Sequence, residues 1–288
     1  TQILVNLSAP SPEVALLGGE THEVFYGRDS QPFLKWIQRG AALPLILASG
    51  QHTFWPYRYY PRKPLPKWTQ RYLDLFLYLN KIYAFHPREN RNGGSLTSKE
   101  IGEKRLVAKN VNGVVLAADV LDEIYPDAVF IGLVRHGLAI CEGFIRRGWT
   151  PEEVGALYHT IARKMILDAR ERVNYRLVHF EKMISEPSTL IPEVYQAAGL
   201  DLKKVKNFRL QAKPSMNQKG QRKLTFGTEP YQTHWFELHE IKEQFRQDIN
   251  HNQIARLSAD QIARFMKHAS PEMEELGYLP AQESINNG

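Results

Sequence analysis

Hydrophobic and polar positions follow both helical and strand-like patterns along this chain. Residues 66–83 repeat apolar side chains at steps of three and four, which predicts an amphipathic helix. Residues 114–125 predict a second helix that ends before Pro126. Short apolar runs predict buried strands at residues 2–7 (QILVNL), 129–134 (VFIGLV) and 176–180 (RLVHF).

Two capping boxes predict where later helices begin. Thr150 precedes Pro151 and is followed three positions on by Glu153, and Ser258 is followed in the same way by Gln261. Strands that alternate with helices predict an α/β fold, with a mostly parallel central sheet and helices on both faces. We expect one domain over residues 1–288, with a basic and mobile loop over residues 203–228.

Composition excludes several classes of protein. Of 288 residues 43% are hydrophobic and 24% are charged, which excludes a disordered chain, and no apolar run is long enough to cross a membrane. The single cysteine, Cys141, excludes an intramolecular disulfide, and no residue spacing suggests a metal site. We expect a cytoplasmic protein with no signal peptide at its start. The net charge of +6 favours an anionic partner, which can be a phosphorylated cofactor, an acidic glycan or nucleic acid.

The strongest chemical signal is an arginine between a strand and a helix. Arg135 follows the strand at 129–134 and precedes the apolar run 138–145. Ligands of open α/β sheets bind beyond the carboxyl ends of the strands, and a guanidinium suits a phosphate there. The alternative is a surface arginine at a strand end.

Three further groups are candidates for chemistry. Glu20, in Gly18-Gly19-Glu20-Thr21-His22, is a candidate general base or else a turn cap, while His22 is expected to pack. Lys109 follows a short apolar run, where it can neutralise charge on a leaving phosphate or simply be solvated. Arg222 and Lys223 belong to a basic turn, KGQRK, that is either solvated or in contact with phosphate.

These residues together resemble a sulfotransferase that uses 3′-phosphoadenosine 5′-phosphosulfate (PAPS). The resemblance runs from 106 to 200, through Lys109, YPDA before VFIGLVRHG, and VHFEK, and includes the tail at 257–279. Residues 11–21 are similar to the tyrosylprotein and related Golgi-type enzymes, so a Golgi-lumen type stays open. The family implies a P-loop-like fold, Glu20 as base, Lys109 at the bridging oxygen, and Arg135 at the 3′-phosphate.

Two positions depart from the pattern of that family. Its phosphosulfate loop follows the first strand and opens a helix, and by comparison with that pattern about a dozen residues are absent here between Pro10 and Ser11. Either a flexible loop is missing there or a deletion abolishes donor binding. Gly143 stands where a serine is expected to touch the 3′-phosphate, and Arg146, Arg147 or the turn with Arg222 and Lys223 are candidates to compensate.

The resemblance implies transfer of a sulfuryl group from PAPS to an acceptor hydroxyl, with adenosine 3′,5′-bisphosphate as product. We expect a carbohydrate or another small molecule as the acceptor, because residues 54–68 are aromatic and basic and can line an acceptor cleft. The alternative for this stretch is a packed loop. We expect no nucleic-acid partner. The alternative function is a non-catalytic domain that binds an anionic glycan or nucleotide. No pattern of a nucleotide kinase is present.

Overall fold

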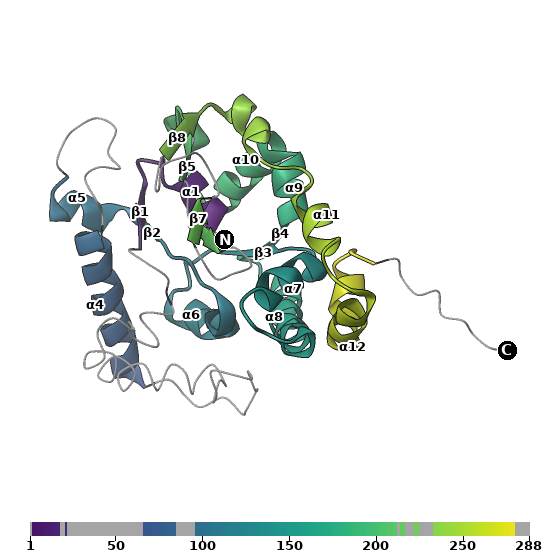
Figure 1. Ribbon diagram of the computed structural model, residues 1–288. Helices are drawn as coiled ribbons and strands as arrows, with labels where there is room; N and C mark the ends of the chain where they lie inside the picture. Colours follow the sequence, from purple (N-terminus) through teal and green to yellow (C-terminus); the bar gives the residue numbers. More distant parts are fainter. Residues whose placement is uncertain are drawn as a thin grey trace.

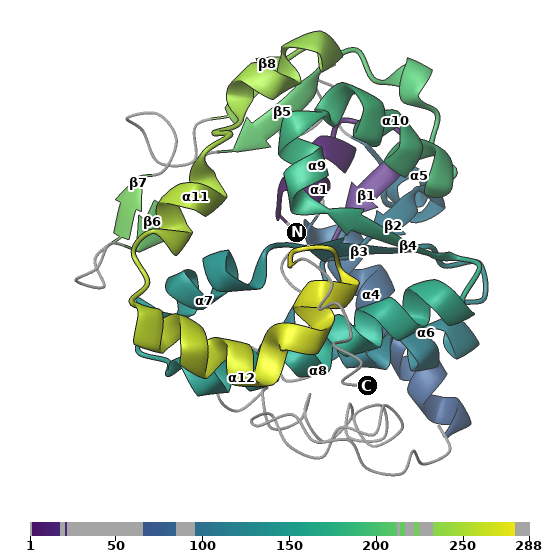
Figure 2. The same cartoon turned by 90° about the vertical axis from the view of Figure 1, so that its right-hand side faces the viewer.

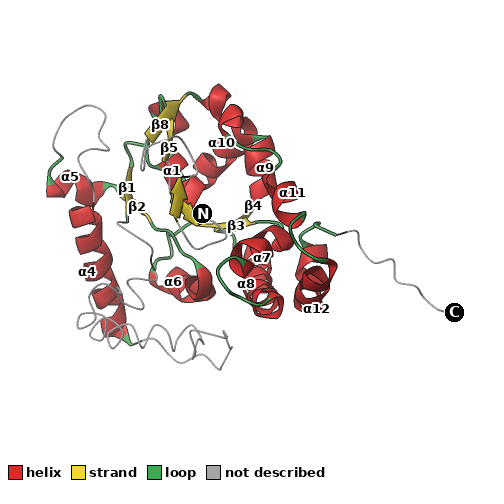
Figure 3. Ribbon diagram, in the orientation of Figure 1, coloured by secondary structure: helices red, strands yellow, loops and turns green. Residues whose placement is uncertain are grey.

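The computed structural model describes residues 2–17, 21, 66–84, 96–211, 214–216, 222–224 and 233–279. Glu20, His22, residues 54–65 and residues 219–221 therefore lie outside the described residues. Helices dominate the described part, and its strands are short (Figures 1 and 3).

Two pairs of parallel strands confirm the predicted α/β class. β3 (Phe130–Val134) pairs with β4 (Tyr175–His179) along its whole length, so the strands predicted at 129–134 and 176–180 are confirmed. β1 (Val14–Leu16) pairs in parallel with β2 (Arg105–Val107). The described strands form separate pairs, so they do not make the one continuous sheet that we expected.

Helices cover both faces of the β3–β4 pair, because apolar side chains alternate along these strands (Figures 1 and 2). One face meets α1 (Gln2–Ser8), α9 (Phe180–Ser185) and α10 (Pro187–Ala197). The other meets α7 (Gly137–Ile145), α8 (Pro151–Glu171) and α12 (Ala259–Glu275). Each face therefore carries a hydrophobic cluster of its own.

A third hydrophobic cluster lies to one side of the first two. It joins β1 to α4 (Lys67–Ala84), the 3-10 helix η2 (Asn112–Ala117) and α6 (Ala118–Ile124). The helices predicted at 66–83 and 114–125 are thus confirmed. The short helix α5 (Ser98–Glu103) follows α4 in the described order and precedes β2.

Both predicted capping boxes are present. Thr150 accepts from the backbone N–H of Glu153, whose carboxylate accepts from that of Thr150, and Ser258 and Gln261 do the same before α12. These caps fix the starts of two helices that pack against each other. The contact is close, because Gly155 of α8 faces the backbone of α12 at Phe265.

The strand predicted at residues 2–7 is wrong. Gln2–Ser8 is the helix α1. Its Leu7 is 2% exposed, and the backbone carbonyl of Leu7 accepts a hydrogen bond from the hydroxyl of Tyr195 at 2.7 Å. A short apolar run fits a buried helix as well as a strand, and here the helix packs against α10 and β5 (Phe208–Gln211).

The chain is continuous and compact at the junction of Pro10 with Ser11. The backbone N–H of Ser11 donates to Ser8 at 3.1 Å, and that of Val14 donates to Ser11 at 3.2 Å. These bonds form a tight connection from α1 to β1, and the absence of phosphosulfate-loop residues at this junction stays a prediction from the resemblance.

The predicted loop over residues 203–228 contains regular structure. It includes the 3-10 helix η3 (Leu202–Lys204), β5, and the antiparallel pair β6 (Pro214–Met216) and β7 (Arg222–Leu224). β5 pairs in antiparallel fashion with β8 (Thr233–Phe236). The 3-10 helix η4 (Leu238–Gln244) and α11 (Ile249–Ile254) then lead to α12.

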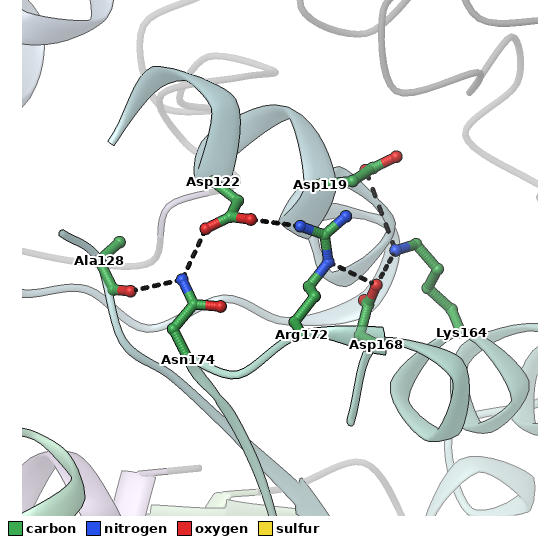
Figure 4. A network of polar contacts seen from close by, with 7 residues as sticks. All are labelled: Asp119, Asp122, Ala128, Lys164, Asp168, Arg172 and Asn174. Atoms are coloured by element: carbon green, nitrogen blue, oxygen red, sulfur yellow. Dashed lines mark hydrogen bonds and ion pairs between the residues drawn. The ribbon is translucent and has the colours of Figure 1, made fainter. Parts of the chain in front are cut away.

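A polar network ties α6 and α8 to the amino-terminal ends of β3 and β4 (Figure 4). The Arg172 guanidinium contacts Asp122 and Asp168, and Lys164 also contacts Asp168. Asn174 donates to Asp122 at 2.6 Å and to the carbonyl of Ala128 at 2.8 Å. The network lies at the end of the pair opposite to Arg135, so we assign it a structural role.

Candidate phosphate-binding site at the end of strand β3

Arg135 lies where sequence analysis places it, between the last residue of β3 and the start of α7. Its half-buried guanidinium stacks 4.5 Å from the ring centre of Phe180, the first residue of α9. The Nε atom donates to the Oδ1 atom of Asn250 at 2.8 Å, and Nη2 donates to the side-chain carbonyl of Gln253. Two amides of α11 therefore orient the guanidinium.

A carboxylate, Glu181, lies beside this guanidinium. Its Oε1 atom accepts from the backbone N–H of His136 at 2.9 Å and from the amide of Asn250. Its Oε2 atom accepts from the hydroxyl of Tyr278 at 2.8 Å. Residues from β3, α9, α11 and the segment after α12 thus meet at one carboxylate.

Burial dominates the electrostatics of the cluster. It lowers the pKa of Arg135, while the charges of Glu181 and Glu142 oppose that shift. Burial also lowers the pKa of His136, which favours a neutral imidazole, and it raises the pKa of Tyr278, as Glu181 does. The arginine keeps its charge at neutral pH, because its ordinary pKa is far above 7. The site therefore presents a partly desolvated cation.

A second carboxylate lies one turn into α7. Glu142 is buried, and it accepts from the Gln253 amide at 3.0 Å and from Arg256 at 3.1 Å, and pairs with Arg146 at 2.9 Å. Three donors thus compensate its charge.

Gly143 and Arg147 are two of the positions at which we predicted a lost or a compensating phosphate contact. Gly143 lies in α7, and a Cβ atom placed on it would lie 4.0 Å from the Nε2 atom of Gln253. The side chain of Arg147 is exposed, and its guanidinium lies 5.4 Å from the ring centre of Phe144. The structure thus brings Gln253, rather than Arg147, to the position that lacks a side chain.

The described residues Leu17 and Thr21 bond to the backbone at Val107 and Lys109. The backbone N–H of Leu17 donates to Val107 at 2.9 Å, which continues the β1–β2 pairing. After Glu20, the backbone N–H and the hydroxyl of Thr21 each donate to the carbonyl of Lys109 at 3.0 Å. Hydrogen bonds therefore join Leu17 to the end of β2 and Thr21 to Lys109, two residues after that strand.

Arg222 and Lys223 are placed only through their backbone, in β7, so their predicted phosphate contacts stay a prediction. Sequence reasoning gave no role to Asn250, Gln253, Glu181 or Tyr278. The last two were part of the motifs that carry the resemblance, whereas no pattern marked the two amides.

The residues at Arg135 fit a phosphorylated ligand. Its Nη1 atom makes no hydrogen bond to any described residue, and a planar guanidinium so oriented can donate to phosphate oxygens. Within the part of the chain that the structure describes, no group of three or more His, Cys, Asp or Glu side chains is arranged to hold a metal ion. No described helix is long and apolar enough to cross a membrane.

No protein-family model matches this chain, and no curated protein matches it. Among solved structures, the chain is similar to the sulfotransferase domain from the Synechococcus PCC 7002 olefin synthase. That similarity has a TM-score of 0.45 at 16% sequence identity, and it covers 92% of this chain and 89% of the other.

Proposed function

We propose that this chain is a sulfotransferase that moves a sulfuryl group from PAPS to an acceptor hydroxyl. The observation that supports this most is the oriented, half-buried guanidinium of Arg135 at the carboxyl end of β3, whose Nη1 atom makes no hydrogen bond to a described residue. It lies within the ordered set of residues that resembles the PAPS-dependent family.

In this proposal each of three residues has one task. Arg135 binds the 3′-phosphate and so fixes the position of the nucleotide. The Glu20 carboxylate takes the proton of the acceptor hydroxyl as the oxygen–sulfur bond forms. Lys109 stabilises the negative charge that grows on the bridging oxygen as its bond to sulfur breaks. When bound, PAPS supplies the sulfuryl group and leaves as adenosine 3′,5′-bisphosphate.

The fastening of Thr21 to Lys109 supports a joint role for Glu20 and Lys109. A base and a cation that act on the two ends of an in-line transfer must keep a fixed separation. Two hydrogen bonds from Thr21, which is buried, hold the chain next to Glu20 against the carbonyl of Lys109. We therefore treat the two segments as one unit.

Binding of adenosine 3′,5′-bisphosphate tests the proposal. A ligand that binds only the folded state raises the melting temperature by mass action, so millimolar nucleotide should raise it. Arg135→Ala should weaken this binding at least 10-fold, because a charge-assisted bond contributes about 1.5–3 kcal/mol. It should change the binding of adenosine 5′-monophosphate much less. No shift for the wild type, or equal losses for both nucleotides, would contradict the proposal.

A second candidate is a non-catalytic domain that binds an anionic glycan or nucleotide. The continuous turn between Ser8 and Val14, with no phosphosulfate loop in it, favours this candidate. Transfer of radiolabelled sulfate from PAPS to a panel of hydroxylated sugars separates the two. Product that disappears in Glu20→Gln supports the transferase, whereas nucleotide binding without any product supports the binding domain.

Carbohydrate acceptors come first in that panel because of the aromatic residues before and in α4. Trp68, in the first turn of α4, is 50% exposed and can stack on a sugar ring. Tyr78, farther along the same helix, is also exposed. We propose that the acceptor approaches from the side of α4.

A further inference from the structure

Gln253 occupies a special position in the cluster around Arg135. Its side-chain carbonyl accepts from Nη2 of Arg135, while its Nε2 atom donates to the buried carboxylate of Glu142 at 3.0 Å. The same Nε2 atom is the nearest atom to the open side of Gly143, at 4.0 Å from where a Cβ would lie. One amide therefore links the cation to α7 at the point where α7 has no side chain.

We infer that Gln253 is a phosphate-recognition residue, whose amide donates to the 3′-phosphate that Arg135 binds. This inference rests on the proposed function and adds a second donor to its site. A Cβ atom on Gly143 would lie 4.0 Å from Nε2, so α7 does not crowd the amide there, and the bond from Arg135 keeps the amide beside the guanidinium. A ligand oxygen at Arg135 thus lies within reach of a second N–H donor.

The exchange of partners that this requires leaves the buried carboxylate paired. When Nε2 turns to the phosphate, Glu142 loses one donor but keeps Arg146 at 2.9 Å and Arg256 at 3.1 Å. The large cost of an unpaired buried charge therefore does not arise. The amide exchanges one ionised acceptor, the Glu142 carboxylate, for another, the phosphate oxygen, so its bond stays charge-assisted.

Asn250 has a different role in this scheme. Its carbonyl accepts from Nε of Arg135 and its amide nitrogen donates to Glu181, so both ends of the side chain are used within the cluster. It is a positioning residue for the guanidinium. Among the described residues, Gln253 is the one within 4.0 Å of a Cβ atom placed on Gly143, which is why we assign it contact with the ligand.

The experiment compares binding of adenosine 3′,5′-bisphosphate and adenosine 5′-monophosphate by titration calorimetry. Gln253→Ala should weaken binding of the bisphosphate about 10-fold and that of the monophosphate less than twofold. Adding Gly143→Ser should restore the bisphosphate to within about threefold of wild type, because a hydroxyl then enters the space that the amide left. Asn252→Ala, in the same helix, is the matched control, since its amide contacts Asp248.

The outcomes separate this inference from the proposed function. If the wild type does not bind the bisphosphate, both are overturned. If the wild type binds it and Gln253→Ala binds equally well, or loses both nucleotides alike, only the role of Gln253 is overturned. Gln253→Glu keeps the acceptor for Arg135 and replaces the donor by a carboxylate, so it should lose the bisphosphate more severely than Gln253→Ala does. It also keeps the question decidable if the alanine variant fails to fold.

Discussion

The contact between α8 and α12 at Gly155 allows a stability prediction with an internal control. A Cβ atom on Gly155 would lie 2.6 Å from the carbonyl oxygen of Phe265 and 3.2 Å from the Cβ atom of His268. Ordinary contacts between carbon atoms are about 3.5–4.0 Å, so Gly155→Ala must push α12 outward by about 1 Å. Overpacking of this kind costs about 1–3 kcal/mol, and we expect the upper part of that range because the obstacle is backbone.

Gly143→Ala is the matched control for this substitution. It also replaces a helical glycine, but its Cβ atom would meet nothing closer than 4.0 Å. Both variants gain about 0.5–1 kcal/mol from the smaller loss of backbone entropy. The difference between their free energies of unfolding therefore isolates the contact with α12.

Urea denaturation followed by circular dichroism measures that difference. We expect Gly143→Ala to be slightly more stable than wild type and Gly155→Ala to be less stable, by about 2 kcal/mol. If Gly155→Ala is as stable as Gly143→Ala, α8 and α12 do not approach as closely as described. The reasoning from the Phe265 backbone would then be refuted.

Two other predictions concern the catalytic unit and the single cysteine. Thr21→Val removes the hydrogen bond from the Thr21 hydroxyl to the carbonyl of Lys109. It should therefore lower the transfer rate about 10-fold and shift the pH profile of the rate, with the nucleotide affinity unchanged. Thr21→Ser should restore the rate and its pH profile. Thr69→Val, a buried threonine in α4, is the control, and an equal loss there would point to a merely structural effect. Cys141 is fully buried, and burial raises the pKa of its thiol to about 12. The native protein should therefore not react with a thiol reagent at pH 8, whereas the urea-unfolded protein should react at once. Rapid labelling of the folded chain would contradict this burial.

Local signals in the sequence predicted the elements around Arg135 well. The capping boxes at Thr150 and Ser258 depend on residues three positions apart, so they can be found without the fold. The strand before Arg135 was clear because it is apolar on both faces. The parallel direction of β3 and β4 followed from the alternation of strands and helices, whereas their pairing is seen only in the structure.

Sequence reasoning failed where a short segment depends on its packing. Residues 2–7 fit a strand or a helix equally well, and Leu7 is drawn into a core made by α9, α10 and β5. The amides of Asn250 and Gln253 could not be found, because they lie 115 and 118 positions from Arg135 and belong to no recognisable motif. Glu20 stays a prediction from the resemblance alone.

The position of Tyr278 has a consequence for how this protein is made. Glu181 and Tyr278 are 97 positions apart, and Arg135 depends on an amide 118 positions later. Contacts of such high sequence separation form late, because the chain between them must first lose its freedom. During synthesis on the ribosome, the surroundings of Arg135 therefore stay incomplete until α12 and Tyr278 have emerged.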